Sequence, residues 1–317
     1  MTTALTAPST TDLTAFGLLA GSLVAGATTG VDDPEWTGAA RSSWEDAPGA
    51  LRRLVREFRR DSGPDGRLLI PGLPLGVLPD TPMVRGSVQR EPALPAAFLS
   101  LVAHGFGDPA AFAAEKSGAL VQDVVPVPGL EHVQGNTGSV ELTFHTENAF
   151  HRHRPDFVLL LCLRPDHDEV AELRTCCVRR VLPELTPRTR DALFRPQFLT
   201  AAPPSFGDSG GGLAHAVLSG DPLDPDLCYD QAATGSATDE GRAALAELST
   251  VVDRVHDGLR LRAGDLAVLD NRVALHGRSS FTPRYDGRDR WLQRMFSFAD
   301  LRRSRDHRVA DGSVLVR

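Results

Sequence analysis

The stretch Ser139-Val-Glu-Leu-Thr-Phe-His-Thr-Glu-Asn-Ala-Phe150 places two metal-ligating residue types two positions apart. In an extended strand the side chains of residues i and i+2 point to the same face, so His145 and Glu147 are expected to lie side by side. A third ligand would complete a 2-His-1-carboxylate facial triad, which binds Fe(II) and leaves positions open for other ligands. The best candidate is His276, in the segment Asp270-Asn-Arg-Val-Ala-Leu-His-Gly-Arg278.

Two arginines follow His276 in the strand-like segment Arg290-Trp-Leu-Gln-Arg-Met-Phe-Ser-Phe298. The even spacing between Arg290 and Arg294 puts both guanidinium groups on the same face of a strand. Guanidinium groups bind carboxylates through paired hydrogen bonds. One arginine near an iron with open positions therefore favours a dicarboxylate cosubstrate, and the second favours a substrate that has a carboxylate of its own.

Four segments carry a family resemblance: Phe144–His151, Phe157–Arg164, Gly264–Asn271 and His276–Arg294. Together they resemble the clavaminate synthase-like family of Fe(II)/2-oxoglutarate-dependent oxygenases, and within it the hydroxylases of free amino acids such as arginine. The last segment is the most specific, because a chance match would have to reproduce both the histidine-to-arginine spacing and the aromatic residues. The resemblance implies an α+β fold with a double-stranded β-helix (jelly roll) core and flanking helices.

The resemblance also implies a role for each residue of the site. His145, Glu147 and His276 match the iron ligands. Arg290 matches the arginine that pairs with the distal carboxylate of 2-oxoglutarate, and Arg294 matches a residue that contacts the substrate carboxylate. Glu147 also tends to face the substrate amine. The implied cofactor is Fe(II), with 2-oxoglutarate and O2 as cosubstrates.

Three further positions are candidates for binding roles. Thr175 lies where a threonine of the wider superfamily contacts 2-oxoglutarate, and Gln122 is a candidate substrate contact on the strand before His145. In the arginine hydroxylases an Asp-x-Asp pair grips the guanidinium of the substrate. The best match here is Tyr229-Asp-Gln-Ala232, which keeps Asp230 but has Ala232 at the second acidic position. The missing acid gives more weight to other polar amino acids as substrates.

These observations predict hydroxylation of an unactivated C–H bond in a free polar or basic L-amino acid, of the arginine, lysine, ornithine or citrulline class, in natural-product biosynthesis. A desaturase or cyclase on the same scaffold is the nearest alternative. A halogenase would need a small residue in place of Glu147. A catalytically silent jelly-roll binding protein and a zinc hydrolase that uses His-Glu-His are further alternatives, although the hydrolase leaves Arg290 unexplained.

Composition narrows the range of partners. The chain has 317 residues, 24% charged, and a net charge of −7, which argues against nucleic-acid binding. The apolar run Phe16–Gly26 is too short to span a membrane and has no basic residue before it, so neither a membrane anchor nor a signal peptide is expected. The four cysteines form no Cys-x-x-Cys motif, which favours reduced thiols in a cytoplasmic protein. A small amino acid is the expected partner, and the oligomeric state is left open.

Hydrophobic periodicity predicts the elements that position these residues. Helices are expected from Thr10, Thr11 or Asp12 onward and over Glu45–Arg60, Leu94–His104, 186–194 and Thr238–Leu259. Besides the two strands already described, strands are expected over Arg67–Ile70, Gly118–Val127, Phe157–Leu163, Arg174–Val181, Leu213–Leu218, Leu227–Asp230 and Gly264–Leu269.

The chain is expected to form a single oxygenase domain over residues 1–317. Residues 1–11 are expected to be disordered, 12–118 to form a mainly helical flank, and 119–300 to form the jelly-roll core with a helical insert. Residues 201–212 are expected to form a lid. Their Gly-Asp-Ser-Gly-Gly sequence resembles the nucleophile motif of trypsin-like proteases, but the structural context of that motif is missing.

Overall fold

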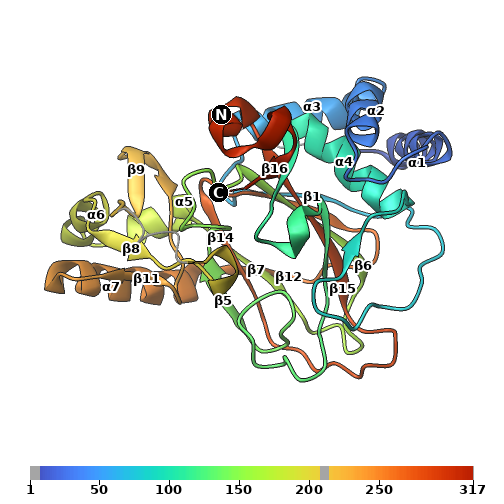
Figure 1. The fold of residues 1–317 in the computed structure, drawn as a ribbon. Helices are drawn as coiled ribbons and strands as arrows, with labels where there is room; N and C mark the ends of the chain where they lie inside the picture. Colours follow the sequence, from blue (N-terminus) through green and yellow to red (C-terminus); the bar gives the residue numbers. More distant parts are fainter. Residues whose placement is uncertain (1–7, 208–213, 317) are drawn as a thin grey trace.

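The computed structural model describes residues 8–207 and 214–316 (Figure 1). The α-helices are α1 (Thr10–Ala25), α2 (Pro34–Trp44), α3 (Gly49–Arg60), α4 (Leu94–Phe106), α5 (Val178–Val181), α6 (Pro187–Leu193) and α7 (Asp239–Val255). Short 3-10 helices are η1 (Lys116–Gly118), η2 (Leu182–Glu184), η3 (Pro204–Phe206), η4 (Leu301–His307) and η5 (Val309–Asp311).

The strands of the first half are β1 (Arg67–Ile70), β2 (Val88–Gln89), β3 (Asp108–Phe112), β4 (Val121–Val124), β5 (Leu142–His145), β6 (Phe157–Arg164) and β7 (Leu173–Cys177). Those of the second half are β8 (Phe198–Thr200), β9 (Leu218–Asp221), β10 (Asp224–Leu227), β11 (Thr234–Ser236), β12 (Asp257–Leu259), β13 (Leu266–Asp270), β14 (Ala274–Arg278), β15 (Trp291–Phe298) and β16 (Val314–Leu315).

Two sheets form the centre of the molecule. The major sheet has eight strands in the order β1-β13-β6-β15-β3-β16, with β4 also on β15 and β2 on β4. The minor sheet has four strands in the order β12-β7-β14-β5. All these pairings are antiparallel except that of β16 with β3. A hydrophobic cluster with residues of both sheets, including Leu173 of the minor sheet and Leu160 and Leu292 of the major sheet, packs them together. The predicted combination of helices and antiparallel sheet is confirmed.

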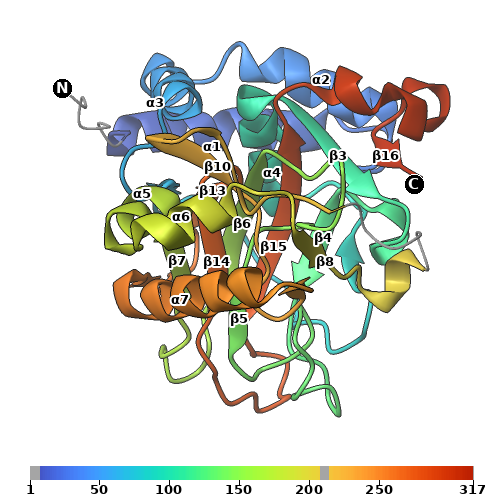
Figure 2. The ribbon, with the colours of Figure 1, turned by 90° about the vertical axis from the view of Figure 1, so that its left-hand side faces the viewer.

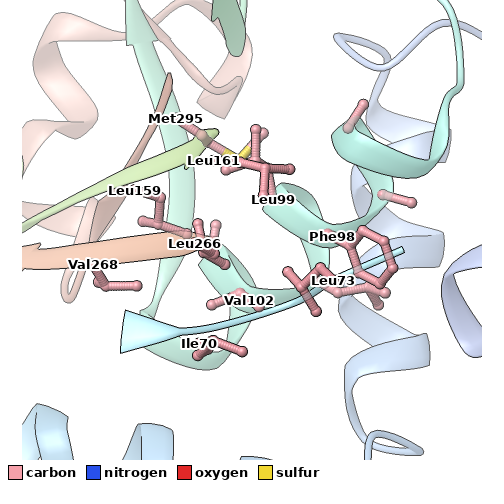
Figure 3. Close-up of a cluster of buried hydrophobic side chains, with 14 of the residues drawn as sticks. Ile70, Leu73, Phe98, Leu99, Val102, Leu159, Leu161, Leu266, Val268 and Met295 are labelled. Carbon is pink, nitrogen blue, oxygen red and sulfur yellow. The ribbon is translucent and has the colours of Figure 1, made fainter. Parts of the chain in front are cut away.

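The core of the major sheet follows from a continuous apolar sequence. Seven of the eight residues of β6 are buried, and β6 lies between β13 and β15, as expected for an apolar run with no polar alternation. Helix α4 is also apolar on most of its surface and covers the outer face of this sheet. Figure 3 shows Leu99 of α4 beside Leu161 of β6, and Phe98 of α4 beside Leu73.

Helices α1, α2 and α3 pack around α4 on one side of the molecule, and α6 and α7 lie on the other side with β8 and β11 (Figures 1 and 2). A separate hydrophobic cluster joins α7 to the minor sheet, with Leu248 and Val252 against Leu275. The helical insert is therefore present. The expected boundary at residue 118 does not separate a helical part from the sheets, because β1 and β3 precede it and join the major sheet.

Several predicted boundaries are wrong. The first helix is capped by Ser9, whose hydroxyl accepts the Asp12 N–H, so Thr10 and Thr11 are helical rather than disordered. Residues 1–7 lie outside the described chain. Helix α2 was not predicted, although Asp33 caps it and Pro34 opens it.

Other predicted boundaries are wrong at positions where one helix or strand directly follows another. Strand β7 ends at Cys177, where α5 begins, and α7 ends at Val255 because the chain then enters β12. The strands expected at 213–218 and 227–230 are replaced by the hairpin of β9 and β10. The expected lid covered residues 201–212, and residues 208–212 of it, together with residue 213, are outside the described part of the chain.

Within residues 8–207 and 214–316, no helix combines the length and the hydropathy that crossing a membrane requires. Cys162, Cys176, Cys177 and Cys228 form no disulfide with one another, and the first three are buried.

Candidate active site

A row of polar residues crosses the minor sheet from strand to strand. Thr175 of β7 lies opposite Asp257 on one side and His276 on the other. His276 of β14 lies opposite His145 of β5, which forms an isolated bridge with Asp230. Directly opposed residues of paired strands project from the same face of a sheet. The register therefore brings together residues from five separate parts of the sequence.

The side chains of His145, Glu147 and His276 converge at one end of this row. One ligand atom from each lies within 4.8 Å of the other two. The imidazole rings of His145 and His276 are 4.3 Å apart between centroids, and His276 Nε2 is 3.5 Å from Glu147 Oε2. That separation is long for a hydrogen bond but suits two ligands of one metal ion. The predicted convergence of the three residues is present.

The expected location of Glu147 on a strand is wrong. Strand β5 ends at His145, and Glu147 lies in the following turn. Its backbone is held by Asn271, which is fully buried: Asn271 Oδ1 accepts the Glu147 N–H at 2.8 Å, and Asn271 Nδ2 donates to the carbonyls of Glu147 at 3.1 Å and Pro155 at 2.8 Å. Asn271 is the last residue of the family segment Gly264–Asn271, but no role was predicted for it from the sequence.

The electrostatics of the triad suit a divalent cation. Burial alone would raise the pKa of Glu147, but the nearby Arg294 guanidinium and the two histidines outweigh it, so the net pKa is lowered. Burial, with the neighbouring His145, lowers the pKa of His276 to about 4, which keeps this imidazole neutral at pH 7. The Nδ1 atom of His145 lies 2.9 Å from the Thr143 carbonyl, and donation to it leaves Nε2 as the ligating atom.

This donor set fits Fe(II), because two neutral imidazoles and one ionised carboxylate are the ligands of a facial triad. His276 Nε2 is the ring nitrogen that faces Glu147, and the other ring nitrogen, Nδ1, is buried with no hydrogen-bond partner among the described residues. The same three ligands would also accept zinc, so the triad alone does not identify the metal.

Arg294 lies beside the triad in a buried polar network. Its Nη1 atom donates to Glu147 Oε2 at 3.0 Å, and its Nη2 atom donates to Glu115 and Gln122. Gln122 is opposite Arg294 in the pairing of β4 with β15. Gln122 and Arg294, both expected to contact the substrate, therefore lie together beside Glu147, and their substrate-binding roles stay predictions. Glu115 was not predicted.

Arg290 is buried, with 6% of its surface exposed, and it forms no ion pair with the carboxylates of the described residues. Its guanidinium carbon lies 5.6 Å from the centre of the Phe281 ring. The neighbouring side chains show that the two arginines share a face. Trp291 and Met295 belong to the hydrophobic cluster that includes α4, on one face of the sheet. Leu292, at the alternate position between Arg290 and Arg294, belongs to the cluster between the two sheets, on the other face.

Arg278 of β14 lies near the same Phe281 ring as Arg290. Its guanidinium carbon is 5.2 Å from the centre of the Phe281 ring, and its Nη2 atom donates to the Val140 carbonyl at 2.8 Å. Burial, and then the charge of Arg290, lower the pKa of Arg278 to about 9. Arg278 belongs to the His-Gly-Arg sequence, but no function was predicted for it.

The two remaining candidates have partners within the protein. Thr175 Oγ1 accepts a hydrogen bond from Arg67 Nη1 at 2.8 Å. Asp230 Oδ1 accepts the N–H groups of Ala232 and Ala233, at 2.8 and 2.9 Å, so half of this carboxylate stabilises its own turn. Both residues lie in the row beside the triad.

Two other clusters of ligand-type side chains occur in the described chain, but each includes an exposed aspartate. They are His153, Asp306 and His307, and His167, Asp286 and Asp289. The triad differs from both because none of its residues is exposed and because the buried Arg294 pairs with its Glu147.

Comparison with known proteins identifies the family. The model of the family "Taurine catabolism dioxygenase TauD, TfdA family" matches residues 90–296, which is more than half of the chain. The chain belongs to the TauD/TfdA dioxygenase family. Within it, the chain is 60% identical over 287 residues to an L-asparagine oxygenase of Streptomyces coelicolor, covering 90% of this chain and 86% of the relative. It is 34% identical to clavaminate synthase 2 of Streptomyces clavuligerus, with 80% of each chain covered.

A solved structure extends this TauD/TfdA relationship to the whole fold. A crystal structure of an asparagine oxygenase in complex with Fe(II), (2S,3S)-3-hydroxyasparagine and succinate superposes with a TM-score of 0.95 at 55% identity, covering 98% of both chains. The chain is therefore an Fe(II)/2-oxoglutarate-dependent amino-acid oxygenase of the clavaminate synthase-like type. This membership confirms the predicted cofactor and cosubstrate and removes the zinc-hydrolase and silent-protein alternatives.

Proposed function

We propose that this oxygenase hydroxylates free L-asparagine at C3. The observation that carries the proposal is the 60% identity, over 90% of the chain, to an L-asparagine oxygenase. The structure with bound 3-hydroxyasparagine and succinate supports the same substrate and the same carbon. The product is proposed to be a building block for natural-product biosynthesis, and the two facing sheets are proposed to be the two halves of a jelly roll.

His145, Glu147 and His276 are the proposed Fe(II) ligands. With 2-oxoglutarate and O2, the bound iron supplies the oxidising power that removes a hydrogen from an unactivated carbon. The protein positions the reactants: Arg290 binds the distal carboxylate of 2-oxoglutarate, and Thr175 lies beside His276 where it can contact the same cosubstrate. The burial of the site limits the access of water.

Arg294 is the proposed partner of the substrate carboxylate, and Glu147 faces the substrate amine. The three acceptors that now surround Arg294 leave its position fixed before substrate binds. Gln122 and Asp230 are proposed to complete the substrate pocket. A preorganised pocket of this kind lowers the entropy cost of orienting the reacting carbon.

The side chains at 230 and 232 favour an amide over a guanidinium group at the end of the substrate. A bidentate clamp for guanidinium needs two carboxylates, but Ala232 stands where the second acid would be, and Asp230 already uses one oxygen in its own turn. This supports asparagine over arginine, the first member of the class that the sequence suggested.

The test is to incubate the enzyme with Fe(II), 2-oxoglutarate, O2 and each standard amino acid, ornithine and citrulline, and to measure product masses. Asparagine should gain the mass of one oxygen atom, and NMR should locate the hydroxyl group at C3. Loss of two hydrogens would instead show a desaturase or cyclase. Turnover of a basic amino acid without turnover of asparagine would contradict the substrate assignment, and His276→Ala serves as the inactive control.

A further inference from the structure

Arg278 and Arg290 are two buried cations that form no ion pair with a carboxylate of residues 8–207 and 214–316, although the charge of Asp166 acts on Arg290 from a longer distance. Their exposed fractions are 5% and 6%. Both guanidinium carbons lie close to the Phe281 ring, at 5.2 and 5.6 Å from its centre, although one arginine comes from the minor sheet and the other precedes a strand of the major sheet. Neither forms an ion pair within the part of the chain that the structure describes.

A buried charge without a partner is costly, and two neighbouring charges of the same sign cost more. Aromatic contact with Phe281 offsets only part of this cost. Arg278 also has hydrogen-bonding capacity to spare: its Nη2 atom donates to the Val140 carbonyl, while its buried Nε atom has no partner among the described residues. The arrangement fits an anion that binds both guanidinium groups.

The position of Arg278 relative to the metal ligands indicates which anion this is. Arg278 lies two residues after His276 on β14, so both side chains project from the same face and their Cα atoms are about 6.8 Å apart. Leu173, opposite Arg278 on β7, belongs to the cluster between the two sheets, so this face is the inner one. A dicarboxylate bound to the metal at one end would extend along this face.

We propose that Arg278 is a second binding group for the distal carboxylate of 2-oxoglutarate, acting with Arg290 from the opposite sheet. The two guanidinium groups enclose the carboxylate from both sheets and neutralise it, while the carboxylate stabilises two otherwise unpaired cations. This inference rests on the proposed iron centre and on the role of Arg290. It does not depend on asparagine as the substrate.

The experiment compares two keto acids with the variant Arg278→Gln. Both 2-oxoglutarate and 2-oxopentanoate carry the group that chelates iron, but 2-oxopentanoate has a methyl group in place of the distal carboxylate. Dissociation constants are measured without oxygen from the visible charge-transfer band of the Fe(II) complex. We expect the variant to bind 2-oxoglutarate at least ~10-fold more weakly, because a charged hydrogen bond is lost, and to bind 2-oxopentanoate within about 2-fold of the unmodified protein.

Arg174→Gln is the matched control. Arg174 precedes Thr175 on β7, projects from the opposite face of the same sheet and pairs with Glu141. The Arg174→Gln variant should leave the ratio of the dissociation constants for the two keto acids unchanged. If Arg278→Gln does not fold, Arg278→Lys keeps the charge but loses the planar fork, and it should still weaken 2-oxoglutarate selectively.

Equal weakening of both keto acids, or no weakening of either, would overturn the role of Arg278 and leave it a structural residue that ties β14 to the Val140 carbonyl. Absence of the band in the unmodified protein would instead contradict the proposed iron centre. The two failures are therefore distinguishable.

Discussion

Glu147, one of the proposed iron ligands, shows how a single carboxylate can be fixed in place before a metal binds. Its backbone N–H and carbonyl are both bonded to the buried amide of Asn271, and its side chain accepts from Arg294. Burial raises the pKa of Glu147, but the Arg294 guanidinium and then the two neighbouring histidines lower it by more. The ligand is thus fixed in position and in charge by residues that themselves need not touch the metal.

Replacing Asn271 with Ala should loosen this ligand and destabilise the fold. The change leaves the Glu147 N–H and two carbonyl groups buried without their partner, which we expect to cost about 2–3 kcal/mol. Urea unfolding measures the stability, and titration with Fe(II) measures the metal affinity, which should fall. Unchanged values in both measurements would show that the turn holds Glu147 without this amide.

Replacing Arg290 with Ala should separate cosubstrate binding from metal binding. We expect the dissociation constant for 2-oxoglutarate to rise on the order of 10- to 100-fold, because charged hydrogen bonds contribute about 1.5–3 kcal/mol. The affinity for Fe(II) alone should change much less, since Arg290 is not one of the proposed ligands. An equal loss of both affinities would argue against a direct contact with the cosubstrate.

At the level of elements, strand register decides whether the site exists. His145, His276 and Thr175 share a face only because β5, β14 and β7 pair in one register, and a slip by one residue would turn a side chain to the opposite face. The helices on the other side of the major sheet contribute by packing. Gly105 of α4 is in close contact with the Trp44 ring of α2, where a side chain has no room.

The two glycines Gly105 and Gly21 offer a matched test of this packing. A Cβ atom at Gly105 would lie 2.4 Å from Trp44 Cζ2, whereas a Cβ atom at Gly21 of α1 would meet nothing within 4 Å. We expect Gly105→Ala to destabilise the protein by about 1–3 kcal/mol through overpacking. Gly21→Ala should stabilise it by up to about 1 kcal/mol, because alanine favours a helix. Thermal unfolding of both variants checks the prediction, which requires that the two substitutions change the stability in opposite directions.

At the scale of the whole molecule, the site needs both sheets. The proposed ligands His145 and His276 belong to the minor sheet, while Arg294 belongs to the major sheet and Arg290 directly precedes one of its strands. Arg67 of β1 links the two sheets, since it bonds to Thr175 of β7 and pairs with Asp257 of β12. Stability of the whole fold is therefore a condition for binding, and it should depend on pH through buried titratable groups.

His104 of α4 should contribute to loss of stability in acid. Burial, with the nearby charge of Arg41, lowers the pKa of His104 from its usual 6.5 to about 4. The folded state therefore keeps His104 neutral while the unfolded chain takes up a proton below pH 6.5. The contribution is present above pH 6.5 and is lost as the pH falls toward 4, by at most about 3 kcal/mol.

The variant His104→Gln cannot take up this proton. Its unfolding free energy, measured between pH 7 and pH 4, should fall less steeply than that of the unmodified protein. His132→Gln, at an exposed position, should leave the slope unchanged. If His104→Gln follows the slope of the unmodified protein, the neutral state of His104 has no part in acid stability.

Much of the fold could be predicted because its strongest patterns are local. The apolar run of β6, the capped amphipathic sequence of α7 and the alternation that puts Arg290 and Arg294 on one face each depend on neighbouring residues. Such patterns follow from backbone geometry that is the same in every protein. The spacing of His145 and Glu147 correctly indicated a shared site, although the reason given for it, a continuous strand, was wrong.

The sequence by itself determined which residue types were available for an iron site and which of them were near neighbours along the chain. Only the tertiary structure decided that Asn271 holds Glu147, that Glu115 and Gln122 surround Arg294, and that Arg278 comes close to Arg290. These contacts join residues far apart in the sequence, so no local periodicity carries them. They depend on the strand register within each sheet and on how the two sheets pack face to face. Both are determined by the burial of apolar surface over the whole chain.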